Sequence, residues 1–212
     1  MLHLLTGFSL FLMAALVVAV IPGPGIFYVA ARTLSDGRRV GIASTLGTGL
    51  GGLVHVIAGG LGVSAIILTS AEAFAALKFA GALYLIWLGI RAFRDAGELP
   101  VEMTKAAGTV QAFREGVLVE ATNPKTAAFF LAFIPQFLDV AAPHPALQFV
   151  ALGLISVTLN TLADLVVVEA ASATRAGFMR RPQVLRRLRQ GSGLFMMGLG
   201  ASLLLARRPA TS

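Results

Sequence analysis

Residues 4–31 read LLTGFSLFLMAALVVAVIPGPGIFYVAA, an uncharged stretch that is interrupted by Pro22-Gly23-Pro24-Gly25. A hydrocarbon core about 30 Å thick needs roughly 20 apolar helical residues to cross it, so this stretch is long enough to span a membrane. It lacks the basic start and the small-residue cleavage site of a signal peptide, and we interpret it as a retained helix. The stretch therefore predicts a membrane protein whose first span is broken at the proline–glycine repeat.

The composition of the whole chain favours the same class. Of its 212 residues, 57% are hydrophobic and only 13% are charged, whereas soluble domains are about one quarter charged. The chain has no cysteine, which excludes disulfides, thiolate metal sites and thiol nucleophiles. The net charge of +7 does not indicate nucleic-acid binding, because no soluble module remains to carry a basic face.

Five further apolar stretches of spanning length follow the first. They cover residues 40–71, about 73–91, 116–138, 146 to about 171, and 190–206. The loops between them are short and leave no room for a soluble domain. We therefore expect an all-α, polytopic membrane protein of six transmembrane helices.

Lysine and arginine residues gather in alternate loops of this predicted topology. The loops after spans one, three and five hold 13 of the 17 basic residues. Because cytoplasmic loops carry an excess of lysine and arginine, we expect these three loops in the cytoplasm. Both chain termini would then lie on the opposite, periplasmic or extracellular, side.

The longest loop divides the chain into two halves of three spans each. We expect a single membrane domain over 1–212, with repeat one at about 1–95, a cytoplasmic linker at about 96–113 and repeat two at about 114–212. With an odd number of spans per half, the second half must enter the membrane upside down. Asn123-Pro124 breaks span four where the proline–glycine repeat breaks span one. This pattern predicts two inverted three-helix repeats with broken helices one and four.

The two breaks form the centre of the predicted site. Proline and glycine interrupt helical hydrogen bonds, and the freed backbone groups are tolerated in hydrocarbon only against protein or a water-filled cavity. Either break alone could be an ordinary kink, but matched breaks in inverted halves predict a binding site near the midplane. The predicted substrate-binding and transport residues are Pro22, Gly23, Pro24, Gly25, Asn123, Pro124, Lys125, Asn160 and Asp164.

Charged residues inside the spans suggest how this site would work. A lysine such as Lys125 near mid-membrane costs about 2.5–3.5 kcal/mol on insertion scales, so it should face the interior and meet a carboxylate. Asp164 is the expected protein partner, and Asn160 lies four residues earlier on the same helical face. Asp164, or alternatively Glu120, would bind the amino group of a substrate or the coupling proton. Glu169 is interpreted as an interfacial charge near the cytoplasmic arginines. For Lys125 and Asp164, a purely structural role as hydrogen-bonded or ion-paired groups is the alternative.

The sequence contains little evidence of a catalytic site. The sequence has no serine with a histidine and acid arrangement and no phosphate-binding loop. His55 is interpreted as a packing or hydrogen-bonding residue, because no second ligand accompanies it at metal-binding spacing. We therefore expect no enzyme activity, no cofactor, no metal site and no ATP site, so that pumping would use an ion gradient. Two alternatives stay open: a non-transporting membrane assembly protein or small membrane enzyme, and an inorganic ion exporter.

Four blocks of sequence carry a resemblance to a known family. They are Pro22-Gly23-Pro24, the glycine-rich second span, Leu77-Lys78-Phe79-Ala80-Gly81-Ala82-Leu83-Tyr84-Leu85, and Asn123-Pro124-Lys125 followed by Phe129-Phe130 and Pro135-Gln136-Phe137. With these blocks in this order, the chain resembles the lysine exporter (LysE) family of translocators over nearly its whole length. The resemblance is greatest to the branch of homoserine and threonine efflux proteins (RhtB).

The resemblance implies secondary active efflux of amino acids or related small metabolites across the bacterial inner membrane. It also implies a proton gradient as the driving force and a homo-oligomer as the working form. Members often place an acidic or amide residue directly after Pro-Gly-Pro, where this chain has Gly25. This difference disfavours cationic amino acids and makes a neutral substrate the expectation.

Overall fold

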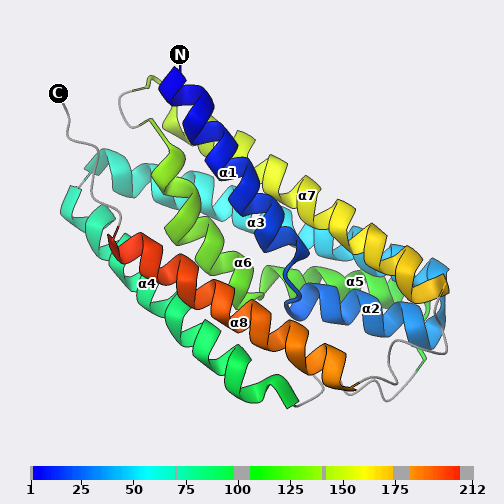
Figure 1. Ribbon diagram of the computed structural model, residues 1–212. Coiled ribbons are helices and arrows are strands. Elements are labelled where there is room, and N and C mark those ends of the chain that lie inside the picture. The colour runs from blue at the N-terminus through cyan, green and yellow to red at the C-terminus, as the bar shows by residue number, and fades with distance from the viewer. Residues whose placement is uncertain (1, 70, 98–105, 140–141, 174–181, 206–212) are drawn as a thin grey trace.

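The computed structural model describes residues 2–69, 71–97, 106–139, 142–173 and 182–205, and over these residues it is all-helical (Figure 1). The helices are α1 (Leu2–Val20), α2 (Pro24–Asp36), α3 (Arg38–Thr69), α4 (Ala71–Arg94), α5 (Thr109–Ala121), α6 (Pro124–Ala128), α7 (Pro145–Ala173) and α8 (Pro182–Leu205). Short irregular helical segments complete the list: η1 (Asp95–Gly97), the π-helical turn η2 (Phe129–Phe133) and η3 (Ile134–Phe137). The expected all-α class is confirmed.

Several of these helices are long and apolar enough to cross a membrane. Three candidate spans are Arg38–Gly62, Thr109–Phe137 and Pro145–Ala173, and a fourth is the pair Gly7–Val20 and Pro24–Asp36, bent by 43°. α4 and α8, which carry arginines toward their cytoplasmic ends in the expected topology, would complete the expected set. The described part of the chain thus has the helices of a polytopic membrane protein, and the count of six spans stays a prediction.

The first span breaks where its prolines stand. α1 ends at Val20, and α2 begins at Pro24, with Gly23 extended before it at φ −124° and ψ −172°. Pro22 and Pro24 have no amide hydrogen and cannot continue the hydrogen bonds of α1, whereas a proline fits the first position of a new helix. The proline–glycine repeat therefore ends one helix and starts the next.

The second break is built around Asn123. α5 ends at Ala121, α6 begins at Pro124, and the Asn123 side chain accepts a hydrogen bond of 3.0 Å from the Lys125 amide. Asparagine is a preferred residue at this capping position, because its side-chain oxygen satisfies an amide that has no helical acceptor. The break in span four is thus a capped helix start.

Glycines set the closest helix contacts. α3 packs along α5 and α7, and α4 packs along α8. At the α4–α8 contact, a Cβ added to Gly89 would lie 2.5 Å from the Gly193 carbonyl oxygen, and the reverse holds for Gly193. On α5, a Cβ on Gly116 would lie 2.6 Å from the Ser44 carbonyl oxygen of α3. Small residues let membrane helices approach this closely, so these glycines permit the close packing of the helices.

The outer surface of the bundle is apolar. On α3, an exposed stripe of leucine, valine and isoleucine side chains recurs every three or four residues: Leu46, Leu50, Val54, Ile57 and Leu61. Exposing this apolar stripe to water would cost free energy, whereas contact with the apolar chains of lipids would not. The interior of the bundle instead holds a phenylalanine cluster made of Phe11, Phe129, Phe130, Phe133 and Phe149.

Some expectations differ from the structure in their boundaries or lie outside it. α5 begins at Thr109, inside the predicted linker of 96–113, and α8 begins at Pro182, before the predicted span of 190–206. Residues 98–105 of the linker lie outside the described residues. The same holds for part of the basic residues used for the orientation: Lys105, Arg175, Arg180, Arg181, Arg207 and Arg208.

Candidate functional site

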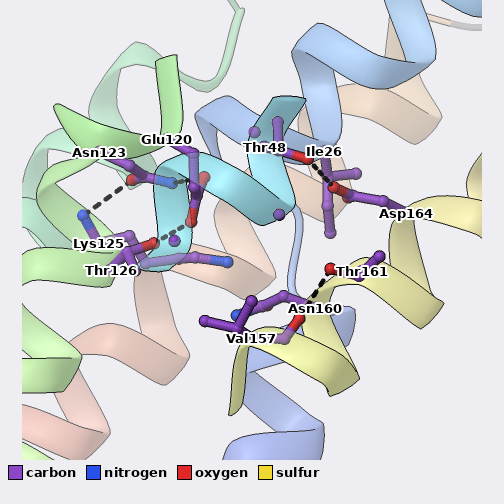
Figure 2. A pocket seen from close by; sticks show the side chains of 13 residues that line it. Ile26, Thr48, Glu120, Asn123, Lys125, Thr126, Val157, Asn160, Thr161 and Asp164 are labelled. Atoms are coloured by element: carbon purple, nitrogen blue, oxygen red, sulfur yellow. Dashed lines mark hydrogen bonds between the residues drawn. The ribbon is translucent and has the colours of Figure 1, made fainter. Parts of the chain in front are cut away.

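A polar pocket lies between α2, α3, α5, α6 and α7, next to both helix breaks (Figure 2). It contains about 390 Å³ of empty space, part of it open to solvent. The residues that line it are Gly25, Ile26, Thr48, Gly49, Gly52, Glu120, Asn123, Lys125, Thr126, Val157, Asn160, Thr161 and Asp164.

Most of the residues predicted for the site meet at this pocket. Gly25, Asn123, Lys125, Asn160 and Asp164 line it together with Glu120. Pro22, Gly23, Pro24 and Pro124 are absent from the lining and form the breaks beside it. The sequence predicted that these residues act together. The structure brings them into one pocket from four separate helices and from the break at Asn123. Their role in transport stays a prediction.

Lys125 bridges the two breaks. Its Nζ donates hydrogen bonds of 3.0 Å to the carbonyl oxygens of Val18 and Ile21 at the end of α1. The Val18 carbonyl has no helical donor because the residue four positions later is Pro22, and the Ile21 carbonyl is freed by the break. The buried ammonium of span four thus satisfies backbone groups that the proline–glycine repeat of span one leaves open.

Asp164 is held by a different group from the one expected. Its Oδ2 accepts a hydrogen bond of 2.8 Å from the Thr48 hydroxyl of α3. The direct pair of Lys125 with Asp164 that the sequence suggested is wrong for this structure, because the ammonium binds backbone carbonyls and the carboxylate binds a hydroxyl. In Figure 2 the two residues lie on opposite walls of the pocket.

Glu120 ties the end of α5 to the start of α6. Its Oε2 accepts 2.8 Å from the Asn123 side-chain amide, and its Oε1 accepts 2.6 Å from the Thr126 hydroxyl. The Glu120 carbonyl oxygen lies 2.8 Å from His55 Nε2 of α3. His55 therefore has the hydrogen-bonding role that the sequence indicated. In the described part of the chain, no group of three or more histidine, aspartate or glutamate side chains could hold a metal ion.

Comparison with known proteins identifies the family. The family described as "LysE type translocator" matches residues 16–207. The chain belongs to this family. The resemblance seen in the sequence is thereby confirmed, and with it the expectation of a transport protein in place of an enzyme.

Two of the curated relatives cover nearly the whole length of this LysE-type translocator, and a third covers about two thirds of it. The chain is 33% identical over 198 residues to an uncharacterized membrane protein of Vibrio cholerae. This alignment covers 93% of this chain and 96% of the Vibrio protein. The chain is also 33% identical over 205 residues to the homoserine/homoserine lactone efflux protein of Salmonella typhimurium, 93% and 95% of the two chains. The leucine efflux protein of Salmonella choleraesuis is 27% identical over 147 residues, 68% of each chain. No solved structure matches.

The translocator also has a polar cluster that the sequence did not reveal. Arg32 of α2 is buried and contacts Asp36 at 3.0 Å and Glu115 of α5 at 2.6 Å. The Tyr28 hydroxyl donates to the Ala112 carbonyl at 2.9 Å and to Glu115 at 3.0 Å. Sequence reasoning assigned Arg32 to a cytoplasmic loop, and the four-residue spacing from Arg32 to Asp36 was the signal for a helix there.

A further ion pair, outside this cluster, joins α3 to α7. Arg38 donates to Glu169 from Nε at 2.9 Å, and both side chains are exposed. The sequence placed Glu169 near the arginines of the predicted cytoplasmic loops, and this pair agrees with that placement. Both clusters lie at the α2–α3 turn, where α5 begins and α7 ends, so they tie these four helices together at one end of the bundle.

Proposed function

We propose that this LysE-type translocator is a secondary active exporter of neutral amino acids or closely related small metabolites. The observation that carries the proposal is the polar pocket at the two helix breaks, with one lysine and two carboxylates inside an apolar bundle. Relatives of matching length are named homoserine/homoserine lactone efflux protein, and shorter matches are named leucine efflux protein. Homoserine and leucine are both neutral amino acids.

The pocket offers groups for both ends of an amino acid. Gly25 and Ile26 lie in the first turn of α2, where backbone amides have no acceptor within the helix and the helix dipole favours an anion. These amides, with the third proton of the Lys125 ammonium, would bind the substrate carboxylate. Asp164 or Glu120 would bind the amino group, and Asn160 would contribute a further hydrogen bond.

The charges of the pocket support coupling to protons. Lys125 contributes one amino group, and Glu120 and Asp164 contribute two carboxyl groups that can each carry a proton. A zwitterionic amino acid adds no net charge, so one carboxylate stays available for a proton. Moving one charge through 100 mV supplies about 2.3 kcal/mol, enough to drive a modest concentration gradient.

Helix packing supports the proposed six-span, inverted-repeat topology. A twofold relation between the halves would pair α3 with α7 and α4 with α8, and both pairs pack together. The same relation makes α7 the counterpart of α3, and the broken helix α1–α2 the counterpart of α5–α6. The contact of α3 with α5 then predicts a contact of α7 with the first broken helix, and α7 does contact α1 and α2. We place the protein in the bacterial inner membrane with both termini outside, repeats at about 1–95 and 114–212, and a homo-oligomeric working form.

The test is export from cells that express the protein and are loaded with dipeptides containing homoserine or leucine. We expect the wild type to release the free amino acid at least about tenfold faster than Lys125→Ala, which loses a buried, charge-assisted group. Leu118→Ala, at a lipid-facing position of α5 that is 65% exposed, is the matched control and should export normally.

Purified protein in liposomes separates the transporter from an accessory protein. Export in cells without transport in liposomes would indicate a non-transporting assembly protein. Equal export by the wild type and Lys125→Ala would show that the substrate does not bind at this pocket through Lys125.

A further inference from the structure

Gly25 of α2 and Glu120 of α5 contact each other at the pocket wall. A Cβ added to Gly25 would lie 2.6 Å from Glu120 Oε2, closer than real side chains approach. The carboxylate therefore occupies the space that any larger residue at position 25 would need. Residues almost 100 positions apart in the sequence thus share one place in the pocket.

The Glu120 carboxylate has only neutral partners. Its two hydrogen-bond donors are the Asn123 amide and the Thr126 hydroxyl, and the residue is 8% exposed. The ion pairs among the described residues lie elsewhere, and none includes Glu120. The Lys125 ammonium is close enough to act on this charge through space, but its hydrogen bonds go to the carbonyl oxygens of Val18 and Ile21 and not to the carboxylate. A buried carboxylate without a direct ion pair is costly, and a cationic group of a ligand would supply that pair.

The position of this charge fits one end of an amino acid. The ammonium and carboxylate of an α-amino acid are attached to the same carbon, so their two subsites must adjoin. Glu120 lies on the same side of the pocket as Asn123 and Lys125 (Figure 2), and its carboxylate adjoins Gly25 at the start of α2. Asp164 lies across the pocket, where it accepts from Thr48.

We propose that Glu120 binds the ammonium group of the exported amino acid, and that Gly25 is a specificity-determining position because its missing side chain makes room for this carboxylate. The proposal rests on the function proposed above and names the residue that distinguishes substrates by their ammonium group. The 2-hydroxy analogues, which lack the ammonium, would be poor substrates. Asp164 is then the carboxylate left for the coupling proton.

The experiment uses the purified full chain in liposomes and measures counterflow of L-homoserine and L-leucine, with their 2-hydroxy analogues as competitors. Glu120→Gln keeps the size of the side chain and removes its charge. We expect it to lower counterflow at subsaturating substrate at least about tenfold and to abolish discrimination against the hydroxy analogue. Glu169→Gln, which removes an exposed carboxylate outside the pocket, is the control and should match the wild type.

Two variants test the role of Gly25. Gly25→Asp alone places two carboxylates in one space and should lose counterflow. The double variant Gly25→Asp/Glu120→Asn moves the carboxylate from α5 to α2 and should recover discrimination for the ammonium group. Size-exclusion profiles in detergent establish that each variant is folded.

Each outcome bears on a separate part of the proposal. Wild-type rate and discrimination in Glu120→Gln would overturn the ammonium site while leaving the exporter intact. A double variant no better than Gly25→Asp would overturn the role of Gly25. A folded wild type without counterflow of either amino acid would overturn the proposed function, and this inference with it.

Discussion

Lys125 and Asp164 face the same pocket, and each is held by neutral groups. The Lys125 ammonium donates to the carbonyl oxygens of Val18 and Ile21, while the Asp164 carboxylate accepts from Thr48. A direct ion pair would satisfy both charges and leave little for a ligand. In the observed arrangement, both side chains are positioned by the protein while their charges still act on whatever enters the pocket.

The proton-coupling role of Asp164 gives a prediction for a single substitution. Asp164→Asn keeps the size of the side chain and the oxygen that accepts from Thr48, but it cannot exchange a proton. We expect counterflow of homoserine or leucine to persist, while accumulation driven by an imposed pH gradient falls at least about tenfold. Proteoliposomes with and without the gradient provide both measurements.

The matched variant for Asp164 is Thr48→Val, which removes the hydroxyl and leaves the carboxylate. We expect it to reduce the coupled rate less than Asp164→Asn does. If Asp164→Asn still accumulated substrate under the pH gradient, the coupling proton would have to bind elsewhere.

Among the helices, the α4–α8 contact depends on glycine. A Cβ on Gly193 would lie 2.5 Å from the Gly89 carbonyl oxygen, whereas a Cβ on Gly198 of the same helix would meet nothing within 4 Å. We expect Gly193→Ala to destabilise the folded protein by roughly 1–3 kcal/mol, because the two helices must move apart. Gly198→Ala should leave stability unchanged or slightly raised, since alanine favours helix.

Thermal unfolding of the two purified variants in detergent measures this difference. Both substitutions add the same methyl group to the same helix, so the comparison isolates the contact with α4. Equal melting temperatures for Gly193→Ala and Gly198→Ala would show that α4 and α8 do not pack through these glycines.

For the molecule as a whole, the testable property is its orientation in the membrane. The chain has no cysteine, so single cysteines can be introduced without a background signal. Gly108 and His144 are exposed and flank the Thr109–Phe137 span. We expect an impermeant maleimide to label His144→Cys in spheroplasts and to label Gly108→Cys only after the membrane is opened, as the basic loops predict.

Other labelling patterns would have definite meanings. Labelling of both cysteines from one side would show that Thr109–Phe137 does not cross the membrane. A reversed pattern would place both termini in the cytoplasm and overturn the orientation.

Much of the fold could be predicted from local sequence. The apolar stretches mark the membrane helices because crossing hydrocarbon requires a long run of apolar residues. Pro22-Gly23-Pro24 and Asn123-Pro124 mark the breaks because proline has no amide hydrogen and asparagine caps a new helix. Gly25, Asn123 and Lys125 were predicted from these breaks, since they are adjacent to them in the chain, whereas Asn160 and Asp164 were predicted as polar side chains inside a membrane span.

Contacts between distant segments could not be predicted in this way. Lys125 contacts backbone carbonyls of α1, Arg32 is buried against α5, and Glu120 occupies the space beside Gly25. Each contact depends on how helices far apart in the chain pack against one another. Hydropathy and spacing describe one helix at a time, so they identify which polar residues lie in the membrane. The partners of those residues are set by the packing of the helices, because only packing brings their side chains within hydrogen-bonding distance.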